Sequence, residues 1–431
     1  MSHRTIYQPP PTDAVSPTRT SAAQPLIFQF VLVVVGTAAV AIPVGPLSLL
    51  TAIGLVLLPV TAKYFRTRQF TTLRRLMWLW VTIILAATVV HFDVWRATLG
   101  AVIYPIAITL IVLLLRELCR GDERSLAWLA VAVGLGIALG VALQPIGIAA
   151  NQSVIKSGYG LSVVIVWLGV SSALALPPTS RMLISLTLSG WLIFSDFRSG
   201  AAIVAISALV AWVGAKVRHL SPVRVIALVA LGAIFSMVGV SMYSSAAEQG
   251  FLGSEAQQRY LAQSAAEGGL LLAGRPELVV SLSAISNHFW LGRGGDPSFS
   301  FTERLDALGS LAQAGITLSP VNVERVMGES INSHSLLFTS WVAQGVFGIT
   351  PWVALAALLY VGAYRALRRR SRLAPLIIFF AFELTWDILF SPWSPREEVW
   401  LGLALTAVLL QNPGEEDEKS GRSQFRGVSR R

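Results

Sequence analysis

Apolar segments long enough to cross a lipid bilayer recur along this chain from residue 26 to residue 410. A spanning helix needs about 20 apolar residues, because each residue adds about 1.5 Å and the hydrocarbon core is about 30 Å thick. Composition agrees with this pattern, since 54% of the residues are apolar and only 13% are charged. A soluble domain carries roughly 25% charged residues. The sequence therefore predicts an all-α, polytopic membrane protein.

About twelve segments are candidate transmembrane helices, and several are shorter than the standard length of about 20 residues. They are residues 26–44, 46–62, 76–90, 98–115, 126–144, 161–176, 182–195, 200–215, 225–243, 335–363, 375–391 and 399–411. Nine of them fall within residues 26–243 and three within residues 335–411. The polar termini, residues 1–25 and 412–431, are expected to be disordered tails. Because many spans follow, the first apolar run is interpreted as a signal anchor that is not cleaved.

The basic residues predict the orientation of these spans. Lys and Arg total 33, and with twelve spans and both termini inside, 24 of them fall on the cytoplasmic side and 9 on the other. Cytoplasmic loops carry such an excess. The net charge of +10 is therefore explained by orientation signals and contacts with anionic lipid, and a nucleic-acid partner is disfavoured.

The same orientation places residues 244–334 outside as one large loop. Ordinary connections have about 4–6 residues, so a loop of this length is usually functional or disordered. Helical stretches at 254–267 and 277–286 and glycines at 292–295 predict a small, partly helical cap. Cys119 is the single cysteine and is expected in a short charged loop beside Arg116, Glu117 and Arg120, so the cap has to fold without an internal disulfide.

Four polar clusters face outward in this topology, at residues 195–200, 274–277, 288–295 and 332–335. Arg198 and Arg275 are candidate ligands of a diphosphate, because the planar guanidinium matches phosphate oxygens. Each also has a purely structural interpretation, as an ion pair with Asp196 or with Glu277. Charged side chains at membrane depth usually face a cavity or a partner.

His334 is the candidate general base, because histidine titrates near neutral pH and this one lies where the polar loop meets an apolar helix. It could equally be an interfacial residue, with Asn332 or Ser333 as an ordinary helix N-cap. His288 and Arg293 in the third cluster, and Asp196 in the first, are candidate supporting residues of the site. The residues show no metal-ligand spacing, and residues 292–295 lack the βαβ context of a dinucleotide site.

Two acidic residues, Glu383 and Asp387, lie one helical turn apart within a predicted span. Ionisable residues inside a membrane are costly and often functional. The pair is consistent with a proton path in a transporter, with polar contacts between helices, or with the wall of an active-site cavity. Asp387 lies toward the outer end of its helix and is the alternative candidate base.

The order of these clusters resembles the O-antigen ligase and polysaccharide polymerase family of bacterial envelope glycosyltransferases. Four segments carry the resemblance: Phe-Ser-Asp-Phe-Arg-Ser-Gly at 194–200, Gly-Arg at 274–275, Asn-His-Phe-Trp-Leu-Gly-Arg-Gly at 287–294, and the helix from Ser-His-Ser-Leu at 333–336 to Gly-Val-Phe-Gly at 345–348. Ser335 stands where the family usually has Asn, and Gln344 lies in the zone of a frequent Glu. The acceptor therefore stays open.

The resemblance implies a metal-independent, inverting glycosyltransferase without a cofactor, multi-pass in the bacterial inner membrane, with residues 244–334 in the periplasm. Its donor would be a glycan on undecaprenyl diphosphate, and its acceptor another glycan or lipid A core. Other polysaccharide assembly proteins would be possible partners. Arg198 and Arg275 would bind the diphosphate, and His334 would deprotonate the acceptor hydroxyl. The alternative is a secondary transporter or flippase of lipid-linked sugars, which twelve spans and the Glu383/Asp387 pair also fit.

Overall fold

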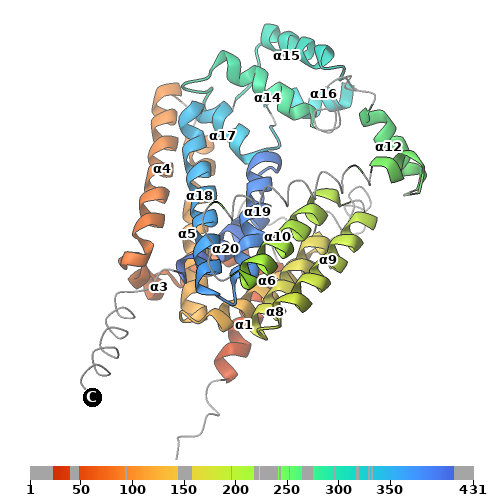
Figure 1. Cartoon of the computed structure of the whole chain (residues 1–431). Helices are drawn as coiled ribbons and strands as arrows, with labels where there is room; N and C mark the ends of the chain where they lie inside the picture. The colour runs from red at the N-terminus through yellow and green to blue at the C-terminus, as the bar shows by residue number, and fades with distance from the viewer. Residues whose placement is uncertain are drawn as a thin grey trace, which may run out of the picture.

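The computed structural model describes residues 23–38, 48–92, 95–143, 158–195, 197–217, 244–251, 253–264, 275–295, 297–316, 320–328 and 333–411, together with residues 223, 241 and 331. Within these residues all regular secondary structure is helical (Figure 1). The all-α prediction is therefore confirmed for this part of the chain. The predicted span at 225–243 and both predicted tails lie outside the described residues.

The helices before the large loop are α1 (Ala23–Ala38), α2 (Leu49–Val56), α3 (Leu58–Phe65), α4 (Thr71–His91), α5 (Trp95–Cys119), α6 (Glu123–Ala142), α8 (Gly160–Ala173), α9 (Pro178–Phe194) and α10 (Arg198–Lys216). Those that follow are α12 (Ser254–Ser264), α14 (Pro276–Asn287), α15 (Phe301–Gln313), α16 (Pro320–Met327), α17 (Leu336–Gln344), α18 (Thr350–Arg369), α19 (Ala374–Phe390) and α20 (Pro395–Leu409). Each predicted span among the described residues coincides with one or more of these helices.

Five described segments are long and apolar enough to cross a membrane, namely Arg68–His91, Thr98–Cys119, Glu123–Ala142, Arg198–Lys216 and Leu336–Arg369. Leu26–Ala38 and Gly160–Ala173 are apolar but shorter. A membrane protein with several spanning helices is thus consistent with the structure. The number twelve stays a prediction.

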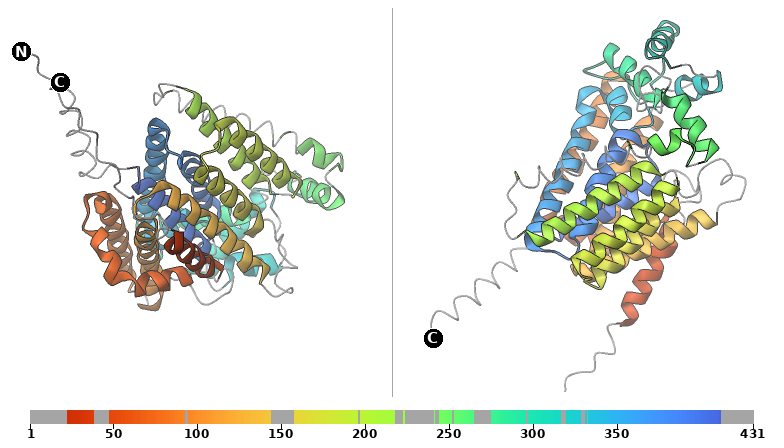
Figure 2. Two further views of the ribbon diagram at one scale, coloured as in Figure 1. Left: turned by 90° about the horizontal axis from the view of Figure 1, so that it is seen from below. Right: turned by 45° about the vertical axis from the view of Figure 1, so that its right-hand side comes forward.

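The bundle is built around α19 and α20, which lie in its centre and are buried along most of their length. Around them α6 packs closely against α8 and α1 (Figure 2). Glycine makes this approach possible: a Cβ on Gly134 or on Gly169 would lie 2.8 Å from a backbone oxygen of the facing helix. Small residues at such contacts let helices in a membrane come together without large side chains between them.

One predicted span is divided in the structure. The sequence predicted a single helix over 335–363, but α17 ends at Gln344 and a 3₁₀ segment, Gly345–Ile349, precedes α18. Gly345 has a φ of 66°, a left-handed conformation that favours glycine. Pro351 then fits the first turn of α18, where its missing N–H costs no hydrogen bond. The outer part of the predicted span is therefore a separate short helix.

The helices α14, α15 and α16 form a cap at the end of the bundle where α17 begins (Figure 1). The cap has its own apolar core, which includes Val280, Leu311, Met327 and Val342. Val342 belongs to α17, whereas Leu336 at the other end of α17 is buried in the bundle core. The small, partly helical cap predicted from the sequence is present, and α17 is shared between cap and bundle.

Cys119 is placed differently from the prediction. The sequence assigned it to a short charged loop, but it ends α5 and is only 1% exposed. The loop itself is short, since α6 begins at Glu123 after its N-cap Asp122, whose carboxylate accepts a hydrogen bond from Ser125 N at 2.8 Å. Because the turn is tight, the thiol of Cys119 is buried in the bundle core.

Candidate functional site

A very small space of about 10 Å³ lies where the cap meets the bundle, and two of the predicted site residues, Arg275 and His334, line it. Arg275 precedes α14, His334 precedes α17, and Phe390 ends α19 on the third side. The cap therefore contributes a cation to this space, and the segment before α17 contributes an imidazole. We call this space the His334 pocket.

The backbone of His334 is in an uncommon conformation. Its φ of 43° lies in the left-handed region, which non-glycine residues adopt rarely. The next residue, Ser335, is extended and caps α17, its hydroxyl accepting a hydrogen bond from Phe338 N at 3.2 Å. The same hydroxyl donates to the carbonyl of Ile388 at 3.0 Å. Ser335 thus holds the His334 turn against α19.

The helix cap differs from the sequence prediction, which favoured Asn332 or Ser333. Ser335 is the N-cap, and Ser333 is buried one residue before His334. Asn332 lies outside the described residues. The N-cap was wrongly assigned because several small polar residues precede the apolar run, and each of them is a residue type that N-cap positions prefer.

Arg275 reaches across from the cap to the bundle. Its Nη1 donates a hydrogen bond of 2.7 Å to the carbonyl of Phe390, and the guanidinium carbon lies 5.8 Å from the centre of the Phe390 ring. The C-terminal end of a helix presents carbonyl oxygens with a partial negative charge. Glu277, which the sequence offered as an ion-pair partner, lines the same pocket and is buried.

Asp387 lies one turn before the end of α19 and close to this pocket. It is 2% exposed, and its Oδ1 accepts a hydrogen bond from Ser391 Oγ at 2.7 Å. Arg275 and Arg396 are near enough to act electrostatically on its carboxylate. One turn further in, Glu383 is 3% exposed. For both acids, one carboxylate oxygen has no hydrogen-bond partner among the described residues.

Arg198 is the first residue of α10 and is half-buried on the turn after α9. The turn is held by Ser189, whose hydroxyl donates to the carbonyl of Ala201 at 2.8 Å. Arg198 is not among the residues that line the His334 pocket. Asp196, its predicted ion-pair partner, lies outside the described residues.

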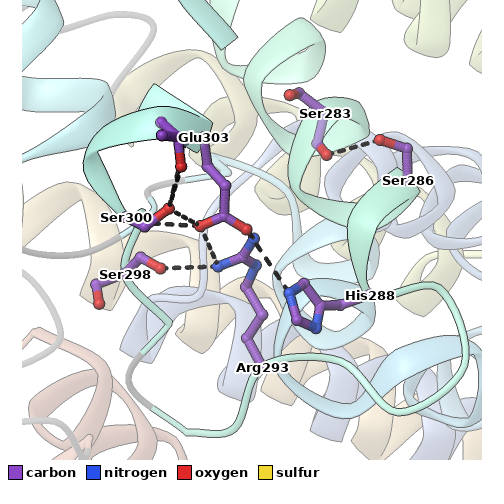
Figure 3. Close-up of polar contacts among 8 residues, drawn as sticks. Ser283, Ser286, His288, Arg293, Ser298, Ser300 and Glu303 are labelled. Atoms are coloured by element: carbon purple, nitrogen blue, oxygen red, sulfur yellow. Dashed lines mark hydrogen bonds and ion pairs between the residues drawn. The ribbon is translucent and has the colours of Figure 1, made fainter. Parts of the chain in front are cut away.

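His288 and Arg293 belong to a different cluster, inside the cap. Figure 3 shows the carboxylate of Glu303 between the two side chains. Arg293 binds both carboxylate oxygens, with Nη1 at 3.2 Å from Oε2, and Nη1 also donates to the carbonyl of Ser298 at 2.9 Å. His288 Nε2 lies 3.7 Å from Glu303 Oε1. The structure therefore separates these candidate supporting residues from Arg275 and His334.

The cluster around Glu303 has a structural explanation. Glu303 completes a capping box with Ser300 at the start of α15, which satisfies backbone N–H groups at that helix end. The Arg293 guanidinium lowers the pKa of Glu303 to about 2. An arginine held by both oxygens of one carboxylate is committed to that ion pair, so this cluster orders the cap.

The segment that contains Arg293 is joined to α17 by its backbone. Arg293 N donates to Val342 O at 2.8 Å, and Gly294 N donates to Ala343 O at 2.9 Å. Gly292 and Gly345 lie at this joint, both with positive φ, and a Cβ on Gly345 would lie 2.0 Å from the carbonyl oxygen of Trp290. The segment 288–295 is thus joined to the C-terminal end of α17, whereas His334 precedes the other end of that helix.

The sequence did not predict that the polar residues at the start of α20 are buried inside the bundle. The sequence analysis used Arg396 only as an orientation signal, yet its Nη2 lies 3.0 Å from Glu397 Oε1 and its guanidinium lies over the Trp400 ring. Glu398 is fully buried and accepts a hydrogen bond from Thr51 Oγ1 at 3.0 Å. The run Ser-Pro-Arg-Glu-Glu before an apolar helix is the signal that could have located this group.

Comparison with known proteins adds no assignment: no protein-family model matches the sequence, and no curated protein is detectably similar to it. Among the described residues, His, Cys, Asp and Glu side chains do not form a group of three that could hold a metal ion. Any functional conclusion therefore has to come from the pocket itself.

Proposed function

We propose that this protein is an integral-membrane glycosyltransferase that moves a glycan from an undecaprenyl-diphosphate donor to an acceptor hydroxyl at the outer face of the bacterial inner membrane. The observation that carries the proposal is the His334 pocket. There a cation from the cap, Arg275, and an imidazole at a helix mouth, His334, face the same small space. That combination suits an anionic leaving group and a hydroxyl nucleophile.

In this mechanism Arg275, together with Arg198, binds the diphosphate of the donor. Their charge stabilises the diphosphate as it leaves, which is where negative charge develops. The acceptor oxygen attacks the anomeric carbon, the bond from that carbon to the diphosphate oxygen breaks, and His334 takes the proton of the hydroxyl. The configuration at the anomeric carbon is inverted, and the lipid diphosphate is released.

Arg198 enters this mechanism on the resemblance and on its place in the bundle. It begins α10, and α10 packs against α19, the helix that ends at the pocket. The opposite end of α10 contacts α18, where Gly214 faces Leu367. Since α10 has 19 residues and each adds about 1.5 Å, Arg198 lies at the end of α10 that is remote from the contact with α18.

The orientation is part of the proposal, with both termini in the cytoplasm and the cap in the periplasm. Its support is the asymmetry of basic residues in the sequence. Arg181, Arg369, Arg370 and Arg372, all assigned to the cytoplasmic side, line one cavity at the end of α19 opposite the His334 pocket. Membrane lipids, the lipid-linked donor, a glycan or lipid A core acceptor and other polysaccharide assembly proteins are the proposed partners.

The test is a transfer assay with purified protein in detergent, a lipid-diphosphate-linked glycan and an acceptor glycan. A transferase forms a new glycosidic bond in the absence of any membrane or gradient. A preparation that binds the donor but never forms the bond, with either a second lipid-linked glycan or lipid A core as acceptor, contradicts the proposal.

A transporter or flippase of lipid-linked sugars is the second candidate, because Glu383 and Asp387 are buried one turn apart in α19. Such a pair could carry protons through the membrane. In vesicles, that function predicts gradient-dependent movement of the lipid-linked sugar and its loss in Glu383→Gln. Bond formation in detergent would remain absent.

A further inference from the structure

A second cavity lies far from the His334 pocket. It has a volume of about 650 Å³, within the range of ligand sites, and its lining comes mainly from α8, α9, α10, α18 and α19. Along α19 its wall includes Pro375, whereas the His334 pocket touches Phe390. At about 1.5 Å per residue these positions are about 22 Å apart. The two sites are therefore at opposite ends of the bundle.

The rim of this cavity is strongly basic. Arg181, Arg369, Arg370 and Arg372 line it, with Glu123 as the single acidic residue of the lining. The carboxylate of Glu123 is engaged, because its Oε1 accepts hydrogen bonds from Ser371 Oγ at 2.8 Å and from Gln411 Nε2 at 3.1 Å. We call this space the arginine cavity. Its rim presents net positive charge to a ligand.

The interior of the arginine cavity is apolar. Val164 from α8 and Phe379 from α19 are fully buried, and Ala208 and Ala211 keep the α10 side open because their side chains are small. A soluble anion gains nothing from such walls. A molecule with an anionic head and a hydrocarbon chain gains from both parts of the cavity.

One polar group lies within the apolar part. Ser207 lines the cavity, is 4% exposed, and its hydroxyl has no hydrogen-bond partner among the described residues. A buried hydroxyl without a partner is costly, so it calls for a partner outside the chain, such as a water molecule or a ligand group. The ester carbonyl of a glycerolipid lies between headgroup and chain, and it is an acceptor of the right kind for this hydroxyl.

We propose that the arginine cavity binds an anionic phospholipid, with the phosphate at the arginine rim, a glycerol ester near Ser207 and an acyl chain along α10 and α19. Basic pockets between helices at the cytoplasmic side recognise such headgroups. The proposal does not depend on the transfer reaction, because no residue of the His334 pocket takes part. It gives the basic residues on this side a specific ligand in addition to their effect on orientation.

The experiment measures lipid retained by the purified full-length protein. Native mass spectrometry after addition of phosphatidylglycerol or phosphatidylcholine gives the fraction of protein with bound lipid. We expect phosphatidylglycerol to be retained and phosphatidylcholine to be lost on mild activation. Two variants test the two parts of the cavity: the double variant Arg370→Gln/Arg372→Gln removes charge from the rim, and Ala211→Trp fills the apolar part. Each is expected to lower phosphatidylglycerol binding roughly tenfold.

The matched control is Arg368→Gln, which removes an arginine from the last turn of α18 that lies over the Tyr364 ring and does not line the cavity. It should bind lipid as the wild type does. Gel filtration and thermal unfolding of every variant show whether it is folded. Wild-type binding in either test variant contradicts the proposal, and so does equal retention of the two lipids. Displacement of phosphatidylglycerol by inorganic phosphate alone shows a soluble-anion site and contradicts it as well.

Discussion

The guanidinium of Arg275 donates a hydrogen bond of 2.7 Å to the carbonyl oxygen of Phe390, 115 positions further along the chain. This contact places a cap residue on the last turn of α19, within electrostatic range of Asp387. Through it, the cation of the His334 pocket is positioned by the bundle and not by the cap alone.

The first prediction concerns the two arginines proposed to bind diphosphate. Arg275→Lys and Arg198→Lys keep the charge but lose the planar fork, so each should reduce transfer at least tenfold. In Arg275→Lys, the lysine ammonium would also have to replace the guanidinium as hydrogen-bond donor to the carbonyl of Phe390. The measurement is the transfer rate at saturating acceptor, and Arg293→Lys, inside the cap cluster, is the control. A Lys variant that works at the wild-type rate shows that bidentate phosphate binding is wrong at that position.

The second prediction concerns His334. His334→Ala should fold, insert and bind the lipid-linked donor, yet lose transfer by a factor of about 10² to 10⁴, which is the usual contribution of a general base. His288→Ala should have little effect on transfer, because His288 lies beside Glu303 in the cap. A transfer assay and a donor-binding assay on both variants make the comparison. Full transfer by His334→Ala would move the base elsewhere, with Asp387 as the next candidate, whereas an equal loss of donor binding would make His334 a binding residue.

The third prediction uses two glycines. Gly345→Ala should lower the thermal midpoint by several degrees and reduce transfer, because the new Cβ meets the Trp290 carbonyl at 2.0 Å and φ is positive. The control is Gly309→Ala, where a Cβ in helix α15 meets no atom within 4 Å. That substitution should be neutral or stabilising by about 0.5–1 kcal/mol. Equal behaviour of the two variants would show that the joint between Gly292 and Gly345 does not hold the cap.

The fourth prediction concerns orientation. Cysteines at Ser264 and Gln313, both exposed, should react with an impermeant thiol reagent applied from outside to cells with a permeabilised outer membrane. Native Cys119 is 1% exposed and would be unreactive from either side, so it cannot serve as the inside marker. The background should be Cys119→Ser, with a cysteine at exposed Arg120 as the inside control. Protection of positions 264 and 313, with labelling at position 120, would reverse the proposed orientation.

The fifth prediction concerns pH. The pKa of Glu303 is lowered from 4.5 to about 2 by Arg293, so the ionised carboxylate stabilises the folded cap. For a lowered pKa this contribution is complete above the unfolded value and is lost as pH falls toward the folded value. The difference in thermal midpoint between wild type and Glu303→Gln should be constant from pH 8 to 5.5 and shrink below about pH 4.5. A difference that stays constant down to pH 3 would contradict the ion pair as its source.

Much of the architecture could be predicted from apolar periodicity, because a membrane-spanning helix satisfies its backbone locally and so leaves a local signal. Every predicted span within the described residues has a helical counterpart, and the cap appeared where the long polar loop was found. The division at Gly345 was missed because apolar residues continue across it. Gly345, Gly348 and Pro351, read together, would have indicated a break.

The site was only partly predictable, since its contacts join distant segments. Arg275 and His334 could be selected from the sequence because they are an arginine and a histidine in polar clusters expected to face outward. The bond from Ser335 Oγ to Ile388 O spans 53 positions, and no local pattern encodes such a pairing. Arg293 shows the same limit: the sequence made it a candidate supporting residue of the site, and only the structure reveals Glu303 as its partner.

The two cores that meet in α17 restrict how the cap can move. Val342 is buried with the cap and Leu336 with the bundle, while Ser335 is bonded to α19. A cap that swung away as a rigid lid would drag α17 with it, break the Ser335 bond and separate His334 from the end of α19. In the proposed mechanism, opening of the cap would therefore be incompatible with the geometry of the His334 pocket. We expect a lipid-linked donor to enter from the bilayer between the helices, while the cap stays in place.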